Sequence, residues 1–133
     1  MIKLAVSPGD PAGIGPDICI KAFGTNTNLG FIPVMFGDIK LFEERAKNLG
    51  YRIKIKEYDG QQELDSGSFW ISPYPMDNKV QAGKPDSSYA SYLLTILKDA
   101  VYKTMDKEFS GLVTGPLNKE LMNKGGISFK GHT

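Results

Sequence analysis

The sequence predicts an α/β fold with a mostly parallel sheet and flanking helices. Short apolar runs typical of buried strands alternate along the 133 residues with amphipathic stretches typical of helices. Glycine and proline gather between these runs, at 8–16, 73–85, 115–116 and 125–131, as expected for turns between regular elements. Strands that alternate with helices favour a layered fold. The length suits a single α/β unit over residues 1–133.

A buried strand is predicted first, at residues 2–6, because this apolar run ends abruptly at Ser7-Pro8-Gly9. Pro16 suits the first turn of a helix, so a helix is expected to follow the turn. We expect its apolar face to hold Ile18, Ala22 and Phe23.

A second strand and helix are predicted at 31–37 and 39–50. Asp38 can cap this helix and Gly50 can end it. Its apolar stripe contains Leu41, Phe42, Ala46 and Leu49. Residues 52–58 alternate between apolar and charged, which predicts a half-exposed strand, and 68–72 predicts another.

The longest predicted helix spans 86–107, with Asp86 or Ser87 as its cap. Its apolar residues follow a period of about 3.6 residues: Tyr89, Tyr92, Leu93, Ile96, Leu97, Ala100, Val101 and Met105. A buried strand is expected at 111–115. A short helix should follow, from Pro116 to Gly125-Gly126.

The composition excludes several classes of protein. A formal net charge of +1 without a basic stripe argues against a nucleic-acid partner. No apolar run approaches the length of a membrane span, and the N-terminal apolar run is too short for a signal peptide. Cys19 is the single cysteine, so no intrachain disulfide can form, and a cytoplasmic location is expected.

The stretch SPGDPAGIGPD, residues 7–17, joins the first strand to the first helix. In an open α/β sheet, ligands bind beyond the carboxyl ends of strands, and glycines allow close backbone approach. The P-loop pattern fails because Pro16 and Asp17 follow the glycines. The dinucleotide pattern would use Gly13 and Gly15, but it needs a third glycine where Ile18 stands. A tight turn without any ligand remains the alternative.

The stretch VTGPLNKE, residues 113–120, repeats the layout of strand, glycine, proline and helix. Lys119 falls in the first turn of that helix, where the helix dipole disfavours a cation. It would suit an anionic or phosphorylated ligand, although a solvated lysine is the simpler reading. His132, the only histidine, lies in a glycine-rich stretch. One histidine cannot build a typical catalytic metal site.

Three stretches together resemble the 4-hydroxythreonine-4-phosphate dehydrogenase family of vitamin B6 biosynthesis. They are SPGDPAGIGPD, AGKPDSSYASYLLTILKDAV and VTGPLNKELMNKGGISFKGHT. The resemblance implies a fold like that of isocitrate and isopropylmalate dehydrogenases and a cytoplasmic homodimer. It also implies oxidation of 4-phosphohydroxy-L-threonine with NAD or NADP. The β-keto acid formed would lose CO2 to give 3-amino-2-oxopropyl phosphate, in pyridoxal phosphate biosynthesis.

The resemblance also implies roles for individual residues. His132 and Thr133 match the substrate-binding GHT motif, and Lys119 is a further candidate for the substrate. Gly13 and Gly15 are candidates for the cofactor. The family's divalent metal, which could be Zn, Mg or Co, is held by histidines beyond this motif, so no metal ligand is expected in this chain.

Members of the resembled family are much longer than this chain. We therefore expect the chain to be the N-terminal portion of a two-domain enzyme and to be inactive alone. Two alternatives stay open. One is a relative that acts on another phosphorylated hydroxy acid, and the other is a stand-alone α/β module that binds an anion or a partner.

Overall fold

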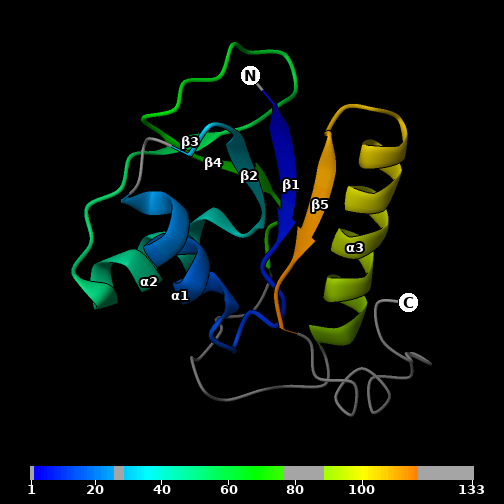
Figure 1. Cartoon of the computed structure of the whole chain (residues 1–133). Helices are drawn as coiled ribbons and strands as arrows, with labels where there is room; N and C mark the ends of the chain where they lie inside the picture. The colour runs from blue at the N-terminus through cyan, green and yellow to red at the C-terminus, as the bar shows by residue number, and fades with distance from the viewer. Residues whose placement is uncertain (1, 26–28, 77–88, 117–133) are drawn as a thin grey trace.

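The computed structural model of the chain describes residues 2–25, 29–76 and 89–116 (Figure 1). Five parallel strands form one sheet in the order β3-β4-β2-β1-β5. The strands are β1 (Lys3–Ser7), β2 (Ile32–Gly37), β3 (Ile55–Glu57), β4 (Phe69–Pro73) and β5 (Gly111–Thr114). The helices are α1 (Gly15–Cys19), the π-helical turn η1 (Ile20–Gly24), α2 (Ile39–Leu49) and α3 (Tyr89–Met105).

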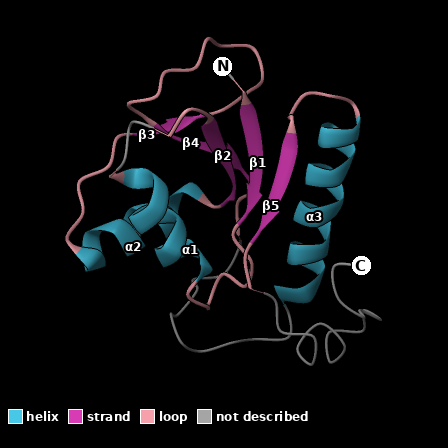
Figure 2. Ribbon diagram, viewed as in Figure 1, coloured by secondary structure: helices cyan, strands magenta, loops and turns pink. Residues whose placement is uncertain are grey.

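The helices cover both faces of the sheet, with α1 and α2 on one side and α3 on the other (Figure 2). Successive strand residues point to opposite faces, and the core divides accordingly. One cluster joins the sheet to α3, and its members include Ala5, Val34, Phe36, Ile96 and Ala100. The other joins the sheet to α1 and α2, and its members include Val6, Met35, Cys19, Ile20, Phe42 and Ala46. The predicted α/β class with a parallel sheet and flanking helices is confirmed.

The predicted apolar face of the first helix is only partly met, because Phe23 alone of its three residues packs against the core, where it is partly buried. Ile18 is 48% exposed and Ala22 is exposed as well. The buried residues are instead Pro16, Cys19 and Ile20, which follow the spacing of three and four expected for one helix face. Ile18 and Ala22 are four residues apart and were expected on one helix face, but both are exposed.

Helix α2 forms as predicted. Asp38 caps it by accepting a 2.9 Å hydrogen bond from the Lys40 backbone N–H. Gly50 ends it in a left-handed conformation, with φ of 77°, which glycine adopts without strain. The buried side contains Leu41, Phe42 and Ala46, and also Arg45.

Two other predictions are only partly met. The strand predicted at 52–58 is confined to β3, which pairs with β4 alone. On α3, Val101 and Met105 were expected on the apolar stripe, but they are 41% and 72% exposed in the described structure. The predicted cap of α3 and the predicted helix at 116–126 fall outside the described residues, apart from Pro116.

Candidate functional site

Two glycine-rich segments meet at the carboxyl edge of the sheet. The first is the β1–α1 loop, residues 8–14, and the second is the segment 115–116 that follows β5. β1 and β5 are neighbours, with Ser7 paired to Thr114 at their ends. In a parallel α/β sheet, this edge is where ligands bind.

Backbone hydrogen bonds join the two segments. Gly115 donates from its N–H to the Ser7 carbonyl at 2.6 Å, and Asp10 donates to the Pro116 carbonyl at 3.2 Å. A Cβ on Gly9 would overlap the Pro116 carbonyl oxygen, and one on Gly115 would overlap the Pro8 carbonyl oxygen. The segments are therefore packed backbone against backbone.

Gly13 and Gly15, the two glycines predicted to bind the cofactor, stand where packing and turn geometry leave little room for a side chain. A Cβ on Gly15 would overlap the carbonyl oxygen of Pro8. At Gly13, the N–H donates to the Asp10 carbonyl at 2.9 Å, and an added Cβ would lie only 3.3 Å from that oxygen. A role of either glycine toward a cofactor remains a prediction.

The side chain of Asp10 shapes the β1–α1 loop. Its Oδ1 accepts a 2.9 Å hydrogen bond from the Ala12 backbone N–H, a local turn that aspartate forms readily. Together with the hydrogen bond from the Gly13 N–H to the Asp10 carbonyl, this contact closes residues 10–13 into a compact turn just after β1.

Arg45 of α2 forms hydrogen bonds with the backbone of the same loop. Its side chain is almost fully buried, at 4% exposure. Nη2 donates to the Pro11 carbonyl at 2.6 Å, and Nη1 donates to the Gly13 carbonyl at 3.0 Å. Nη1 also forms a 3.2 Å ion pair with Asp17 Oδ1. Arg45 therefore compensates the negative charge of Asp17 in the first turn of α1.

Sequence reasoning missed Arg45. The available signal was its position in the apolar stripe of α2, between Phe42 and Ala46. A charged residue is almost never fully buried unless it is paired. This position could have indicated a buried partner for Arg45, but not its identity, because the contacts lie 28 to 34 residues away in sequence.

The ends of β2 and β4 complete the edge. Asp38 Oδ2 accepts a 3.0 Å hydrogen bond from the Met76 backbone N–H. Tyr92 of α3 donates to the Tyr74 carbonyl at 2.6 Å, and Tyr74 donates to Asp99 Oδ2 at 2.9 Å. Burial, followed by the hydrogen bond to Asp99, raises the pKa of Tyr74. Burial, followed by the charge of Asp38, raises the pKa of Tyr92. Both hydroxyls therefore stay protonated near neutral pH.

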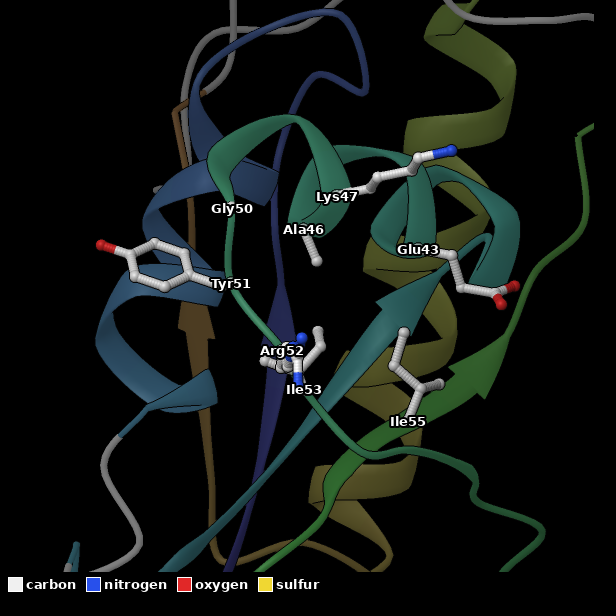
Figure 3. A pocket seen from close by; sticks show the side chains of 8 residues that line it. All are labelled: Glu43, Ala46, Lys47, Gly50, Tyr51, Arg52, Ile53 and Ile55. Carbon is white, nitrogen blue, oxygen red and sulfur yellow. The ribbon is translucent and has the colours of Figure 1, made fainter.

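The cavity inside this edge is small, about 10 Å³, and is lined by Pro8, Phe36 and Tyr92 among others. A groove of about 580 Å³ lies elsewhere, where α2 ends and the chain runs into β3 (Figure 3). Ala46 on α2 faces Ile53 and Ile55 across this groove. None of the residues that line this groove belongs to the two glycine-rich segments.

The remaining predicted site residues, Lys119, His132 and Thr133, lie outside the described residues. Within residues 2–25, 29–76 and 89–116, no three His, Cys, Asp or Glu side chains come together as metal ligands. Among the helices of these same ranges, none is long and apolar enough to cross a membrane.

The fold is that of an α/β protein with a parallel sheet, and the two glycine-rich segments meet at the carboxyl edge, where such sheets generally bind ligands. Residues 31–133, most of the chain, match the family model described as "Pyridoxal phosphate biosynthetic protein PdxA". The chain belongs to this family.

Curated relatives carry the name 4-hydroxythreonine-4-phosphate dehydrogenase. The one from Pseudoalteromonas translucida is 35% identical over 135 residues, and the one from Pseudoalteromonas atlantica is 36% identical over 134. Each match covers 99% of this chain but 40% of the relative. The chain thus spans about two fifths of the length of these relatives.

Solved structures of proteins with the same name share the fold. The crystal structure from Burkholderia phymatum superposes with a TM-score of 0.88 at 22% identity, covering 99% of this chain and 41% of that one. The structure from Klebsiella pneumoniae gives 0.88 at 23% identity, with coverages of 99% and 42%.

Proposed function

We propose that this chain belongs to an enzyme that oxidises and decarboxylates 4-phosphohydroxy-L-threonine to 3-amino-2-oxopropyl phosphate, using NAD or NADP. Family membership and the names of the relatives support this proposal. The observation that carries it is the packing of the two glycine-rich segments at the carboxyl edge. These are the segments on which the resemblance to the family rests.

In the proposed reaction, the chain's own residues bind and orient the substrate. His132 and Thr133 are proposed to hold its polar groups, and Lys119 is proposed to contact its phosphate as a point charge. The β1–α1 loop, which contains Gly13 and Gly15, is proposed to border the cofactor. The nicotinamide, when bound, would supply the acceptor for the hydride that leaves the secondary alcohol.

The pairing of Asp17 supports the proposal that a phosphate-bearing ligand binds beside the β1–α1 loop. Arg45 compensates the charge of Asp17 beside the loop, so that carboxylate does not stand unpaired against an anion. A cavity of about 10 Å³ does not enclose a dinucleotide, so we propose that further residues complete the site. The same holds for the divalent metal (Zn, Mg or Co), for which the described residues offer no ligand set.

We further propose a cytoplasmic homodimer without nucleic-acid or membrane partners. A substrate panel tests the main proposal. The protein made from the complete open reading frame is assayed for NAD- and NADP-linked oxidation of 4-phosphohydroxy-L-threonine and of other phosphorylated hydroxy acids. We expect the highest kcat/KM with 4-phosphohydroxy-L-threonine. Preference for another hydroxy acid, or no dinucleotide reduction with any of them, would refute it.

A further inference from the structure

We propose that Arg45 is a positioning residue that holds the β1–α1 loop in its binding conformation for the phosphorylated substrate. This inference rests on the proposed function, because it assumes that the substrate binds at the carboxyl edge. Arg45 would act through the loop rather than by touching the substrate, since its guanidinium is buried and its hydrogen bonds go to the chain itself.

Arg45 supplies hydrogen-bond donors to two backbone carbonyls of the loop. The carbonyls of Pro11 and Gly13 both receive N–H groups from one planar guanidinium. These carbonyls lie inside the turn that Asp10 closes. A guanidinium presents several donors in a rigid fork, whereas a lysine ammonium is a single point charge on a flexible stem. Arginine can therefore hold two carbonyls and Asp17 together.

The loop that Arg45 holds is itself bonded to the second glycine-rich segment. Asp10, at the start of the turn, donates its backbone N–H to the Pro116 carbonyl, and Gly9 packs against the same oxygen. Pro116 leads directly into the stretch of sequence that carries Lys119. A loosened loop would thus remove a support of Pro116, the last described residue before the stretch of sequence that carries Lys119.

This arrangement predicts an effect on binding rather than on the chemical step. Without Arg45, the loop samples other conformations, and the substrate must select the competent one. The apparent affinity falls by the fraction of molecules that remain competent. Once the substrate is bound, the loop is ordered again, so turnover per folded molecule is retained.

The test uses the protein made from the complete open reading frame and two variants of the contact. Arg45→Lys keeps the positive charge but loses the planar guanidinium that donates to both carbonyls at once. Asp17→Asn weakens the ion pair but leaves both carbonyl bonds. Arg52→Lys, at an exposed arginine that lines the groove rather than the β1–α1 loop, is the matched control. Steady-state kinetics give kcat and a separate KM for substrate and dinucleotide, and hydrogen exchange reports on the amides of residues 8–17.

We expect Arg45→Lys to raise the substrate KM about tenfold, which corresponds to about 1.4 kcal/mol, with kcat per folded molecule unchanged. Exchange should quicken at the Asp10, Ala12 and Gly13 amides and stay slow in β2. Asp17→Asn should raise the substrate KM much less than Arg45→Lys because both carbonyl bonds stay, and it should lower the melting temperature because the buried guanidinium loses its counter-charge. Arg52→Lys should behave nearly as wild type. A lower melting temperature with unchanged KM and unchanged loop exchange would overturn the proposal. So would a rise confined to the dinucleotide KM, or a rise with Asp17→Asn that equals that of Arg45→Lys.

The exchange measurement separates this inference from the proposed function. If the wild-type protein oxidises no phosphorylated hydroxy acid, the proposed function fails, and the substrate assignment fails with it. Faster exchange restricted to the loop in Arg45→Lys would still support its holding role. Exchange that does not change, or that quickens equally throughout the sheet, would overturn that role independently.

Discussion

Gly15 and Gly115 press against the same atom, the carbonyl oxygen of Pro8. Gly15 begins α1 and Gly115 follows β5, so they are 100 residues apart in sequence. A Cβ on either one would overlap that oxygen. This shared contact sets how closely the end of β1, the start of α1 and the exit of β5 approach one another.

The shared contact predicts that alanine is not tolerated at either glycine. Gly15→Ala or Gly115→Ala should lower the free energy of unfolding by about 3 kcal/mol, the upper end of the usual cost of overpacking, because the clash is with backbone that cannot rotate away. Gly67→Ala is the matched control. Its added Cβ would lie 3.7 Å from Asp65 Oδ1, an ordinary contact, so a change of only about 0.5 kcal/mol is expected. Chemical denaturation measures all three, and a mild effect at Gly15 would show that the two segments separate easily.

Cys19 should be unreactive in the folded protein. It is buried among apolar residues, and burial raises the pKa of its thiol to about 12. We expect a thiol reagent at pH 8 to label it at least about a hundredfold more slowly than in denaturant, because the thiolate is the nucleophile. Labelling at equal rates in both conditions would contradict the burial.

The same thiol predicts how stability depends on alkaline pH. Above about pH 8.5 the unfolded thiol ionises while the native one stays protonated, so the native state binds more protons. The free energy of unfolding should therefore fall from about pH 8.5 toward pH 12. Cys19→Ala should lose this part of the slope between about pH 8.5 and 10, before tyrosines ionise. Parallel slopes for both proteins would refute the raised pKa.

Much of the fold could be predicted because its signals are local. Apolar runs between glycines and prolines marked β1, β2, β4 and β5, and a capped amphipathic pattern marked α2. The buried side of the first helix was only partly predicted, because five residues of α1 and a π-helical turn hold too little periodicity to settle it. The hydrogen bonds of Arg45 to the β1–α1 loop and the contacts of Gly15 and Gly115 with Pro8 could not be predicted. Both join segments that lie far apart in sequence.

Trp70 offers a probe of acid unfolding. It is the only tryptophan, it is 3% exposed, and its indole N–H donates to the Asp65 carbonyl at 2.9 Å. The hydrogen bond from Lys56, at 2.7 Å, is the main cause that lowers the pKa of Asp65 to about 2. Its contribution to stability is therefore present above about pH 4 and is lost as the pH falls through about 2.

Asp65→Asn should remove that acid-dependent contribution. Fluorescence of Trp70 during acid titration should show that the gap in stability between wild type and variant closes as the pH falls from 4 to 2. Added salt should narrow the gap at pH 7, because the pair is exposed and screened. Asp106→Asn, at an exposed position after α3, controls for net charge. A gap that does not depend on pH would show that the carboxylate's charge is irrelevant.

The outer face of α3 predicts self-association of the 133-residue chain. Val101, Tyr102 and Met105 share one side of the helix and are 41%, 64% and 72% exposed. Nearby, β5 is an edge strand of the described sheet, and unpaired edges and apolar patches both invite association. Burying one such side chain is worth about 1.5–3 kcal/mol, so Tyr102→Glu combined with Met105→Lys should weaken self-association strongly.

Thr95→Glu, at an exposed polar site on the same helix, is the control and should leave self-association unchanged. Sedimentation across a range of concentrations distinguishes these outcomes. A wild-type chain that stays monomeric, melts cooperatively and binds no apolar dye would show that this face is stable in water.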